Sequence, residues 1–200
     1  MLQAGTKPLP GFDSPVLQSQ RAFRSVLDAF AHPGRVETPP APTDWPEPLF
    51  PTSAAICLAL ADFETPVWLD GASDTSDPVR TYLRFHCGCA IAGSPDGARF
   101  AVVTDPAARP RLDGFALGTD PHPEGGATVI VQTTEIGAGF GVRLSGPGIE
   151  RSRAFAAEGI DENFWRERQL LDPLFPRGID LIFADPRCIA AVPRSTRVEV

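Results

Sequence analysis

The stretch from residue 123 to residue 150 carries the pattern around which the rest of the chain is organised. Thr128 to Thr133 is β-branched and apolar, which is typical of a strand buried on both faces. Glycine then recurs at every second position from 137 to 141, and its tolerance of positive φ favours a tight reversal or a bulge. A second strand at 141–144 would complete a hairpin. Because a central strand needs cover on both faces, the pattern predicts a layered α/β sandwich.

An amphipathic helix is predicted near the N-terminus. The capping sequence Asp13-Ser14-Pro15 opens it, and Pro33-Gly34 ends it. Its large apolar side chains recur at helical spacing on one face, at Val16, Phe23, Leu27 and Phe30. The outer aromatic side chains of this wide face exceed what one small domain can cover. We therefore expect the isolated protein to form a homodimer, and a partner to cover part of the same area in a complex.

The remaining elements are short and closely spaced. Residues 1–12 are expected to form an extended arm, and 36–51, with six prolines, a surface connection. Hairpins and crossovers both occur, so the sheet should be mixed, and nothing divides residues 1–200 into more than one domain. Further helices are expected at 52–62, 76–86, 106–117 and 161–171. Further strands are expected at 67–69, 89–92, 100–103, 179–183, 189–192 and 196–198.

Composition narrows the class of protein. Two hundred residues with 42% hydrophobic content suit one globular domain, and a net charge of −7 argues against a nucleic-acid binder. No stretch resembles a signal peptide or approaches 18 consecutive apolar residues, so we expect a cytoplasmic protein that does not span a membrane. The Cys87-x-Cys89 pair beside His86 could ligate a metal, but the four cysteines lack zinc-type spacing and free buried thiols are favoured.

Few residues carry recognisable chemistry. Lys7 is the only lysine and lies in the expected arm, so the body of the chain cannot form the Schiff base that pyridoxal phosphate needs. The glycines at 137–141 lack the spacing of a dinucleotide-binding loop. Ser145 to Gly148 could present amides to an anion, although a simple turn is favoured. His32 and His86 stand at predicted helix ends, where they can cap carbonyls. Residue chemistry alone therefore indicates no catalytic residue, no metal site and no cofactor.

An ordered set of short motifs covers nearly the whole chain, and the set is specific although each motif alone is weak. The motifs are Phe12-x-x-Pro15-Val16-x-x-Ser19-Gln20-x-x-Phe23-Arg24, His32-Pro33-Gly34, Asp62-x-Glu64-Thr65-x-Val67-Trp68-Leu69, Arg84-Phe85-His86, Pro123-Glu124-x-x-Ala127-Thr128, Leu144-Ser145-Gly146-Pro147-Gly148-Ile149, Phe175-Pro176-x-Gly178-Ile179-Asp180 and Pro193-Arg194-Ser195-Thr196-Arg197. Together they resemble one family, the H subunit of the bacterial carbon–phosphorus lyase machinery (PhnH).

The resemblance implies a fold and a setting. The implied fold is a three-layer α/β/α sandwich with a mixed sheet, similar to the large domain of pyridoxal-phosphate transferases but without the cofactor. The implied setting is a complex with the G, I and J subunits, which transfers an alkylphosphonate to ribose C1 of ATP and releases adenine. A radical enzyme then breaks the carbon–phosphorus bond. The family pattern assigns no catalytic residue to this subunit.

Two functional classes follow. The first is a non-catalytic subunit that supports the complex. The second is a stand-alone enzyme acting on a nucleotide or phosphonate held by Arg84, His86, Arg194 and Arg197. Side chains alternate in an extended segment, so the last two arginines should face opposite ways. One should pair with an acid of its own chain, and the other should lie on a surface that binds a partner or a ligand.

Overall fold

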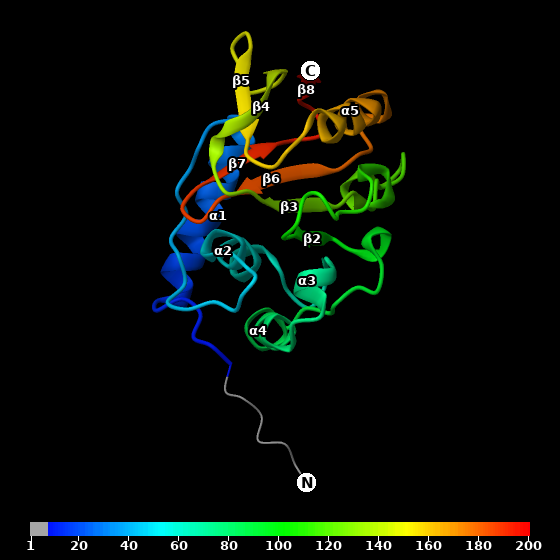
Figure 1. Cartoon of the computed structure of the whole chain (residues 1–200). Coiled ribbons are helices and arrows are strands. Elements are labelled where there is room, and N and C mark those ends of the chain that lie inside the picture. The colour runs from blue at the N-terminus through cyan, green and yellow to red at the C-terminus, as the bar shows by residue number, and fades with distance from the viewer. Residues whose placement is uncertain (1–7) are drawn as a thin grey trace.

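The computed structural model describes residues 8–200 and contains two β-sheets (Figure 1). The larger sheet has five strands in the order β1-β2-β3-β6-β7. The first four are parallel, and β7 runs antiparallel to β6, which confirms a mixed sheet. The strand bounds are Val67–Leu69 for β1, Phe100–Val103 for β2, Thr128–Gln132 for β3, Asp180–Ala184 for β6 and Ile189–Val192 for β7.

Strand β3 lies at the centre of this sheet, between β2 and β6. Val129 and Val131 pack into the hydrophobic cluster on one face of the sheet, while Ile130 packs into the cluster on the other. All three side chains are fully buried. The unbroken apolar run therefore identifies a central strand, as predicted, because neither face of it meets water.

The strand that follows does not pair with β3, so the expected hairpin is wrong. Strand β4, Ile136–Ser145, belongs to a separate three-stranded antiparallel sheet with β5, Arg153–Ala157, and β8, Arg197–Glu199. Of the two structures predicted for the glycines at 137–141, a tight reversal or a bulge, the bulge is observed. The β4–β5 register shifts between Ile136 and Gly141. Gly139 has φ +93°, and a Cβ added there would lie 2.9 Å from the Ala157 carbonyl oxygen.

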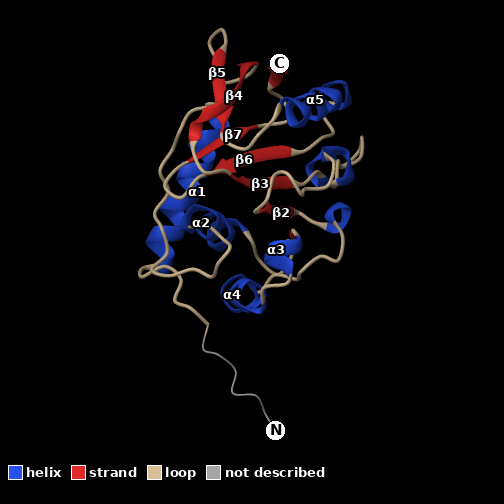
Figure 2. Cartoon of the chain, in the orientation of Figure 1, coloured by secondary structure: helices blue, strands red, loops and turns tan. Residues whose placement is uncertain are grey.

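Four helices form the layer on one face of the large sheet (Figure 2). Three were predicted, and the four-residue α3 was not. Their bounds are Pro15–Ala31 for α1, Pro51–Leu60 for α2, Gly71–Asp74 for α3 and Asp77–Cys87 for α4. Small buried side chains bring α1 and α2 close to each other and to the sheet, as Ala22, Ala29 and Ala54 show.

The opposite face is covered by α5, Glu162–Leu171, and by the small sheet. Phe155, Phe164, Trp165 and Phe183 form one aromatic cluster there, with ring centroids 5.2–5.9 Å apart. The expected α/β/α sandwich has helices only in its third layer, whereas the observed layer combines α5 with the small sheet. The small sheet covers the large one with Val142 and Leu144 of β4, Phe155 of β5 and Val198 of β8.

Three smaller predictions need correction. The strand expected at 89–92 is a single bridge between Ile91 and Val67. The helix expected at 106–117 contains only the short 3₁₀ turn Leu112–Gly114, because Pro110, inside the expected helix, removes a helical hydrogen bond. The proline-rich connection at 36–51 is not wholly on the surface, since the Leu49 side chain is buried in the helical layer.

The expected arm falls partly outside the described residues, which begin at residue 8. Residues 8–12 contain no helix or strand, and Gly11 accepts a hydrogen bond from the Thr43 N–H. Within residues 8–200, no helix combines the length and the apolar character needed to cross a bilayer.

Candidate functional site

The structure divides the four candidate residues between two places. Arg84 and His86 lie on α4, whereas Arg194 precedes β8 and Arg197 begins it. Figure 1 places α4 and β8 at opposite ends of the molecule. The four side chains therefore do not converge on one ligand, and each end has to be considered by itself.

At the α4 end, His86 holds the segment that precedes α1. Its Nε2 lies 2.9 Å from the Leu9 carbonyl oxygen, and its ring packs edge-on against Tyr82 and Phe85. The sequence suggested that His86 caps the end of its own helix, and this is wrong. His86 contacts the Leu9 carbonyl because the N-terminal segment lies within its reach. Arg84 is exposed and forms no ion pair within residues 8–200.

The prediction that His32 caps carbonyl groups at the end of its helix is confirmed. Its Nδ1 lies 3.0 Å from the Asp28 carbonyl oxygen, in the last turn of α1. A ring nitrogen that donates at this position satisfies one of the carbonyls that a helix end leaves free. His32 therefore serves the fold at this position.

At the β8 end, Arg194 is committed to the fold. Its Nη2 lies 2.6 Å from Asp180 Oδ2, and its Nη1 donates to the Pro123 carbonyl at 2.6 Å. Arg197 is exposed, and its side chain forms no ion pair within residues 8–200. Arg194 pairs with an acid of its own chain, as was expected of one of the two arginines, and Arg197 is the exposed one of the pair. The alternation behind this expectation is wrong, because residues 194–195 form a turn and not an extended segment.

A third arginine, Arg168 on α5, contacts the carbonyl groups of the turn between β7 and β8. Its side chain is 1% exposed and forms an ion pair with Asp172, one helical turn along. Its Nη2 lies 3.0–3.2 Å from the carbonyl oxygens of Pro193, Arg194 and Thr196. Sequence reasoning missed this residue. The spacing of Arg168 and Asp172 was visible, but the contact with a turn 25 residues away was not.

A cavity of about 440 Å³ lies beside this turn. Thr196 is 1% exposed, and its Oγ1 has no hydrogen-bond partner in the described part of the chain. The Phe175 ring is 60% exposed at the rim. The residues that line the cavity are Ser145, Gly146, Pro147, Asp172, Phe175, Arg194, Ser195, Thr196 and Arg197.

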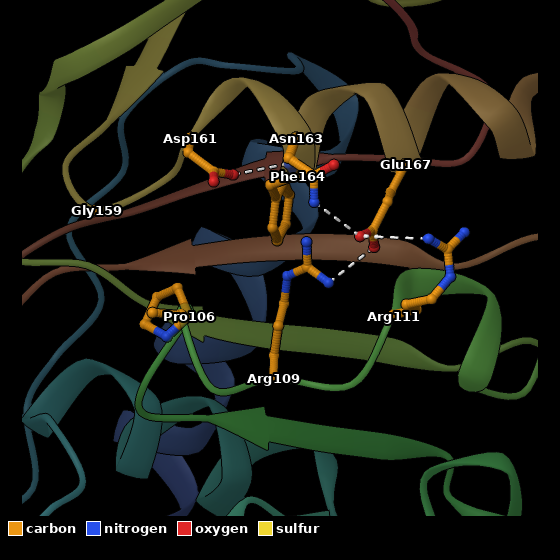
Figure 3. A pocket seen from close by; sticks show the side chains of 9 residues that line it. Pro106, Arg109, Arg111, Gly159, Asp161, Asn163, Phe164 and Glu167 are labelled. Atoms are coloured by element: carbon orange, nitrogen blue, oxygen red, sulfur yellow. Dashed lines mark hydrogen bonds and ion pairs between the residues drawn. The ribbon is translucent and has the colours of Figure 1, made fainter.

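A smaller cavity of about 190 Å³ opens between α5 and the loop after β2, and Figure 3 shows the charged network in its wall. Arg109 Nη1 lies 2.8 Å from Glu167 Oε2, and both side chains are 7% exposed. Asn163 and the Leu112 N–H donate to the same carboxylate, and Arg111 lies 3.8 Å from it. The Arg109 guanidinium also stacks over the Phe164 ring, 4.5 Å from its centroid.

This network controls the ionisation of Glu167. Burial alone would raise the pKa of the Glu167 carboxyl. The hydrogen bonds from Leu112 and Arg109, together with the charges of Arg109 and Arg111, nevertheless hold that pKa below its usual value. Asp161, which caps α5 through the Phe164 N–H, adds a second negative charge to the wall. The charges in this cavity are therefore balanced within the chain, and we assign it a structural role.

The cysteines are free thiols, as expected, with Cys57 and Cys89 buried. Burial raises the pKa of Cys57 to about 12. The neighbouring Cys89 thiol and burial raise the pKa of Cys87, and the Cys87 thiol lowers the pKa of Cys89. In the described residues no three histidine, cysteine or acidic side chains are grouped so as to hold a metal ion.

Comparisons with known proteins place these features in a family. The family described as "Bacterial phosphonate metabolism protein (PhnH)" matches residues 10–199. An "Alpha-D-ribose 1-methylphosphonate 5-triphosphate synthase subunit PhnH" from Rhizobium meliloti (strain 1021) is 36% identical over 191 residues, covering 94% of each chain. A "Putative C-P lyase subunit protein HtxG" from Stutzerimonas stutzeri is 33% identical over 190 residues, covering 92% of this chain and 87% of the relative. The chain therefore belongs to the PhnH family of bacterial phosphonate metabolism proteins, as its ordered motifs predicted.

Proposed function

We propose that this chain is a non-catalytic subunit of the carbon–phosphorus lyase complex and works in the cytoplasm. Both relatives carry subunit names, one of a ribose 1-methylphosphonate 5-triphosphate synthase and one of a C–P lyase. In this role the chain supports the transfer of alkylphosphonate to ribose C1 of ATP, with release of adenine, in association with the G, I and J subunits. Its four free thiols suit a reducing compartment.

The proposal is supported by how the acids at the strand ends are used. Asp70 accepts hydrogen bonds from Ser73 and from the N–H and hydroxyl of Thr104, which ties β1 to β2. Asp185 accepts from the N–H groups of Arg187 and Cys188 and shapes the turn after β6. These carboxylates stand at strand ends, where catalytic groups of α/β folds often lie, yet their oxygens are engaged in holding loops.

The observation that carries the proposal is the outer face of α1. Val16 is 82% exposed, and Phe23 and Leu27 are 43% and 50% exposed. These belong to the apolar face that the sequence predicted, but the helix buries small side chains such as Ala22 and Ala29 instead. An exposed apolar stripe of this size is typical of a protein–protein interface.

The same stripe is suited to a homodimer of the isolated chain. A shallow groove on α1 is lined by Gln20, Phe23, Arg24, Leu27 and Asp28. Arg24 and Asp28 carry opposite charges one turn apart. An antiparallel arrangement of two copies about a two-fold axis would set each Arg24 near the other copy's Asp28 and cover both apolar stripes. In the complex, a partner subunit would replace part of this contact.

The α4 end offers a second contact for a partner. Phe85 is 67% exposed beside His86 and the segment at 8–10, and these residues line a cavity of about 630 Å³. Arg84 stands next to them with its charge on the surface. We propose that Arg84 and His86 contribute to partner binding here, His86 by ordering the N-terminal segment and Arg84 by pairing with an acidic group.

We also propose that the architecture corresponds to the large domain of pyridoxal-phosphate transferases without the cofactor. The five-stranded mixed sheet between two layers is compatible with this likeness. Residues 8–200 contain no lysine, so no side chain there could form the internal aldimine of such an enzyme.

The test combines association with activity. Replacing Phe23 and Leu27 together by serine should convert a dimer to a monomer in light scattering at micromolar concentration. It should also reduce recovery of the G, I and J subunits in a pull-down from phosphonate-grown cells. The control is Phe63→Ser, which removes another exposed ring, far along the chain from α1. We expect it to leave both measurements unchanged.

Two results would count against the proposal. Capture of the partners by the double variant as well as by the unchanged chain would exclude α1 as the contact. Release of adenine from ATP and methylphosphonate by the isolated chain would favour the stand-alone enzyme.

A further inference from the structure

The cavity beside the β7–β8 turn holds a positive charge that the chain does not neutralise. Arg194 pairs with Asp180, and Arg168 pairs with Asp172. Arg197 lines the same cavity and pairs with no acid in residues 8–200. The protein as a whole carries a net charge of −7. A local excess of one positive charge in such a chain marks a place that attracts anions.

The nearest acid on the same face of β8 does not change this balance. Glu199 follows Arg197 by two residues and therefore shares its side of the strand. In the ladder with β4, however, Glu199 lies opposite Arg143, whereas Arg197 lies opposite Ser145. Glu199 thus has a cationic neighbour of its own, and Arg197 has a hydroxyl.

Hydroxyl groups surround the free arginine. Ser145, Ser195 and Thr196 all line the cavity. Thr196 is buried, and its Oγ1 makes no hydrogen bond within the described residues. A buried hydroxyl without a partner destabilises the folded chain. A bound group that accepts its hydrogen bond would remove that destabilisation.

Three carbonyl groups of the turn are engaged by Arg168. The carbonyl oxygens of Pro193, Arg194 and Thr196 point to Arg168 beneath the turn. Arg168 thereby removes three groups that would repel an anion or compete for Arg197. On the facing wall, Gly146 has φ +131°, and a Cβ added there would lie 3.0 Å from the Ser195 carbonyl oxygen. A side chain at this position would disturb the turn that forms the site.

We propose that this cavity binds the phosphate or phosphonate group of a small ligand. A planar guanidinium pairs with two oxygens of a tetrahedral oxyanion, and the hydroxyls donate to the others. The volume of about 440 Å³ exceeds what such a head group alone requires, and the exposed Phe175 ring supplies an apolar wall for an organic substituent. This inference goes beyond the proposed function, which concerns assembly and requires no ligand on this subunit.

The test uses the isolated full-length chain, so its outcome does not depend on assembly with partner subunits. The ¹⁵N-labelled protein is titrated separately with inorganic phosphate and with methylphosphonate. We expect saturable shifts of the backbone amide signals of residues 145–146 and 195–197. Arg197→Gln should weaken binding by at least about tenfold, since charge-assisted hydrogen bonds of this kind contribute about 1.5–3 kcal/mol.

The matched control is Arg187→Gln. Arg187 is also exposed and loses the same charge, but it lies on the turn between β6 and β7, away from the cavity. The Arg187→Gln variant should bind phosphate and methylphosphonate as tightly as the unchanged protein does. Tighter binding of methylphosphonate than of phosphate would assign the site to phosphonates, and the reverse order would assign it to phosphates. No saturable shift with either probe, or equal weakening in both variants, would overturn the proposal.

Discussion

The two faces of the large sheet are closed by different means. On the α5 face, large aromatic rings meet in the interior, and the arginines Arg109 and Arg168 are buried with their charges paired inside the chain. On the α1 face, small side chains pack against the sheet, and Val16, Phe23 and Leu27 point outward, whereas Phe30 packs against the core. The first face is complete within one chain. The second presents apolar surface that a further surface would bury.

The difference shows how burial and function are divided in this fold. A buried charge requires every hydrogen bond that its chain can supply, so residues such as Arg168 are bound to their positions. An exposed apolar residue such as Phe23 contributes little to the folded monomer and remains available for association. Substitutions on the α5 face should therefore lower stability, and those on the α1 face should lower association.

The largest effect is expected at Arg168. Replacing it by alanine leaves Asp172 and three carbonyl groups without their donor, which should lower the free energy of unfolding by roughly 3–5 kcal/mol. Arg166 on the same helix, paired with Glu162 at the surface, is the matched control, and its alanine variant should cost about 0–1 kcal/mol. Urea unfolding measures both. Similar losses in the two variants would contradict the contrast between buried and exposed pairs.

A somewhat smaller and pH-dependent effect is expected at Glu167. At pH 7, Glu167→Gln should cost roughly 3 kcal/mol, because it removes one partner of a buried ion pair. The carboxyl has a lower pKa in the folded chain than in the unfolded chain, so its stabilisation is full above the ordinary value of 4.5. The stabilisation is lost as the pH falls through the folded pKa.

The measurement is the unfolding free energy of both proteins between pH 7 and pH 3. The difference between them should be constant near neutrality and should shrink in the acid range. A difference that stays constant down to pH 3 would show that the charge of Glu167 does not stabilise this face.

The smallest effects distinguish the two arginines of the C-terminal turn. Arg194→Ala should lower stability by about 1.5–3 kcal/mol, because it breaks charge-assisted hydrogen bonds to Asp180 and to the Pro123 carbonyl. Arg197→Ala should change stability by less than about 0.5 kcal/mol, since its side chain is exposed. Thermal melting separates the two. Equal melting temperatures for the two variants would mean that Arg194 is no more essential to the fold than Arg197.

Local patterns were sufficient where one element decides the outcome. The apolar run of β3, the capped start of α4 and the amphipathic α5 all lie where the sequence placed them. Helix α1 also starts at the predicted Pro15, but the Ser14 side chain does not cap it. They were predictable because capping and periodicity depend on neighbours within a few residues. The helix expected at 106–117 did not form because a weak helical pattern could not overcome the interior Pro110.

Partners distant in sequence were not predictable. Nothing near residue 109 indicates that Glu167 lies against it, and nothing near Arg168 indicates the turn at 193–196. The candidate cavity was only partly predicted. The sequence indicated that one of Arg194 and Arg197 serves the fold, but the turn at 194–195 and the position of Ser145 opposite Arg197 come from the tertiary structure.

By itself, the sequence determined the family, the central buried strand, the helix starts and the presence of one wide apolar face on α1. These depend on residue identity and spacing along the chain. Only the tertiary structure decided which way that face points, because Ala22 and Ala29 allow a closer approach to the sheet than Phe23 and Leu27 would. It also decided that β4 leaves the main sheet and that Arg197 alone keeps an uncompensated charge at the turn, since both depend on contacts between segments far apart in the chain.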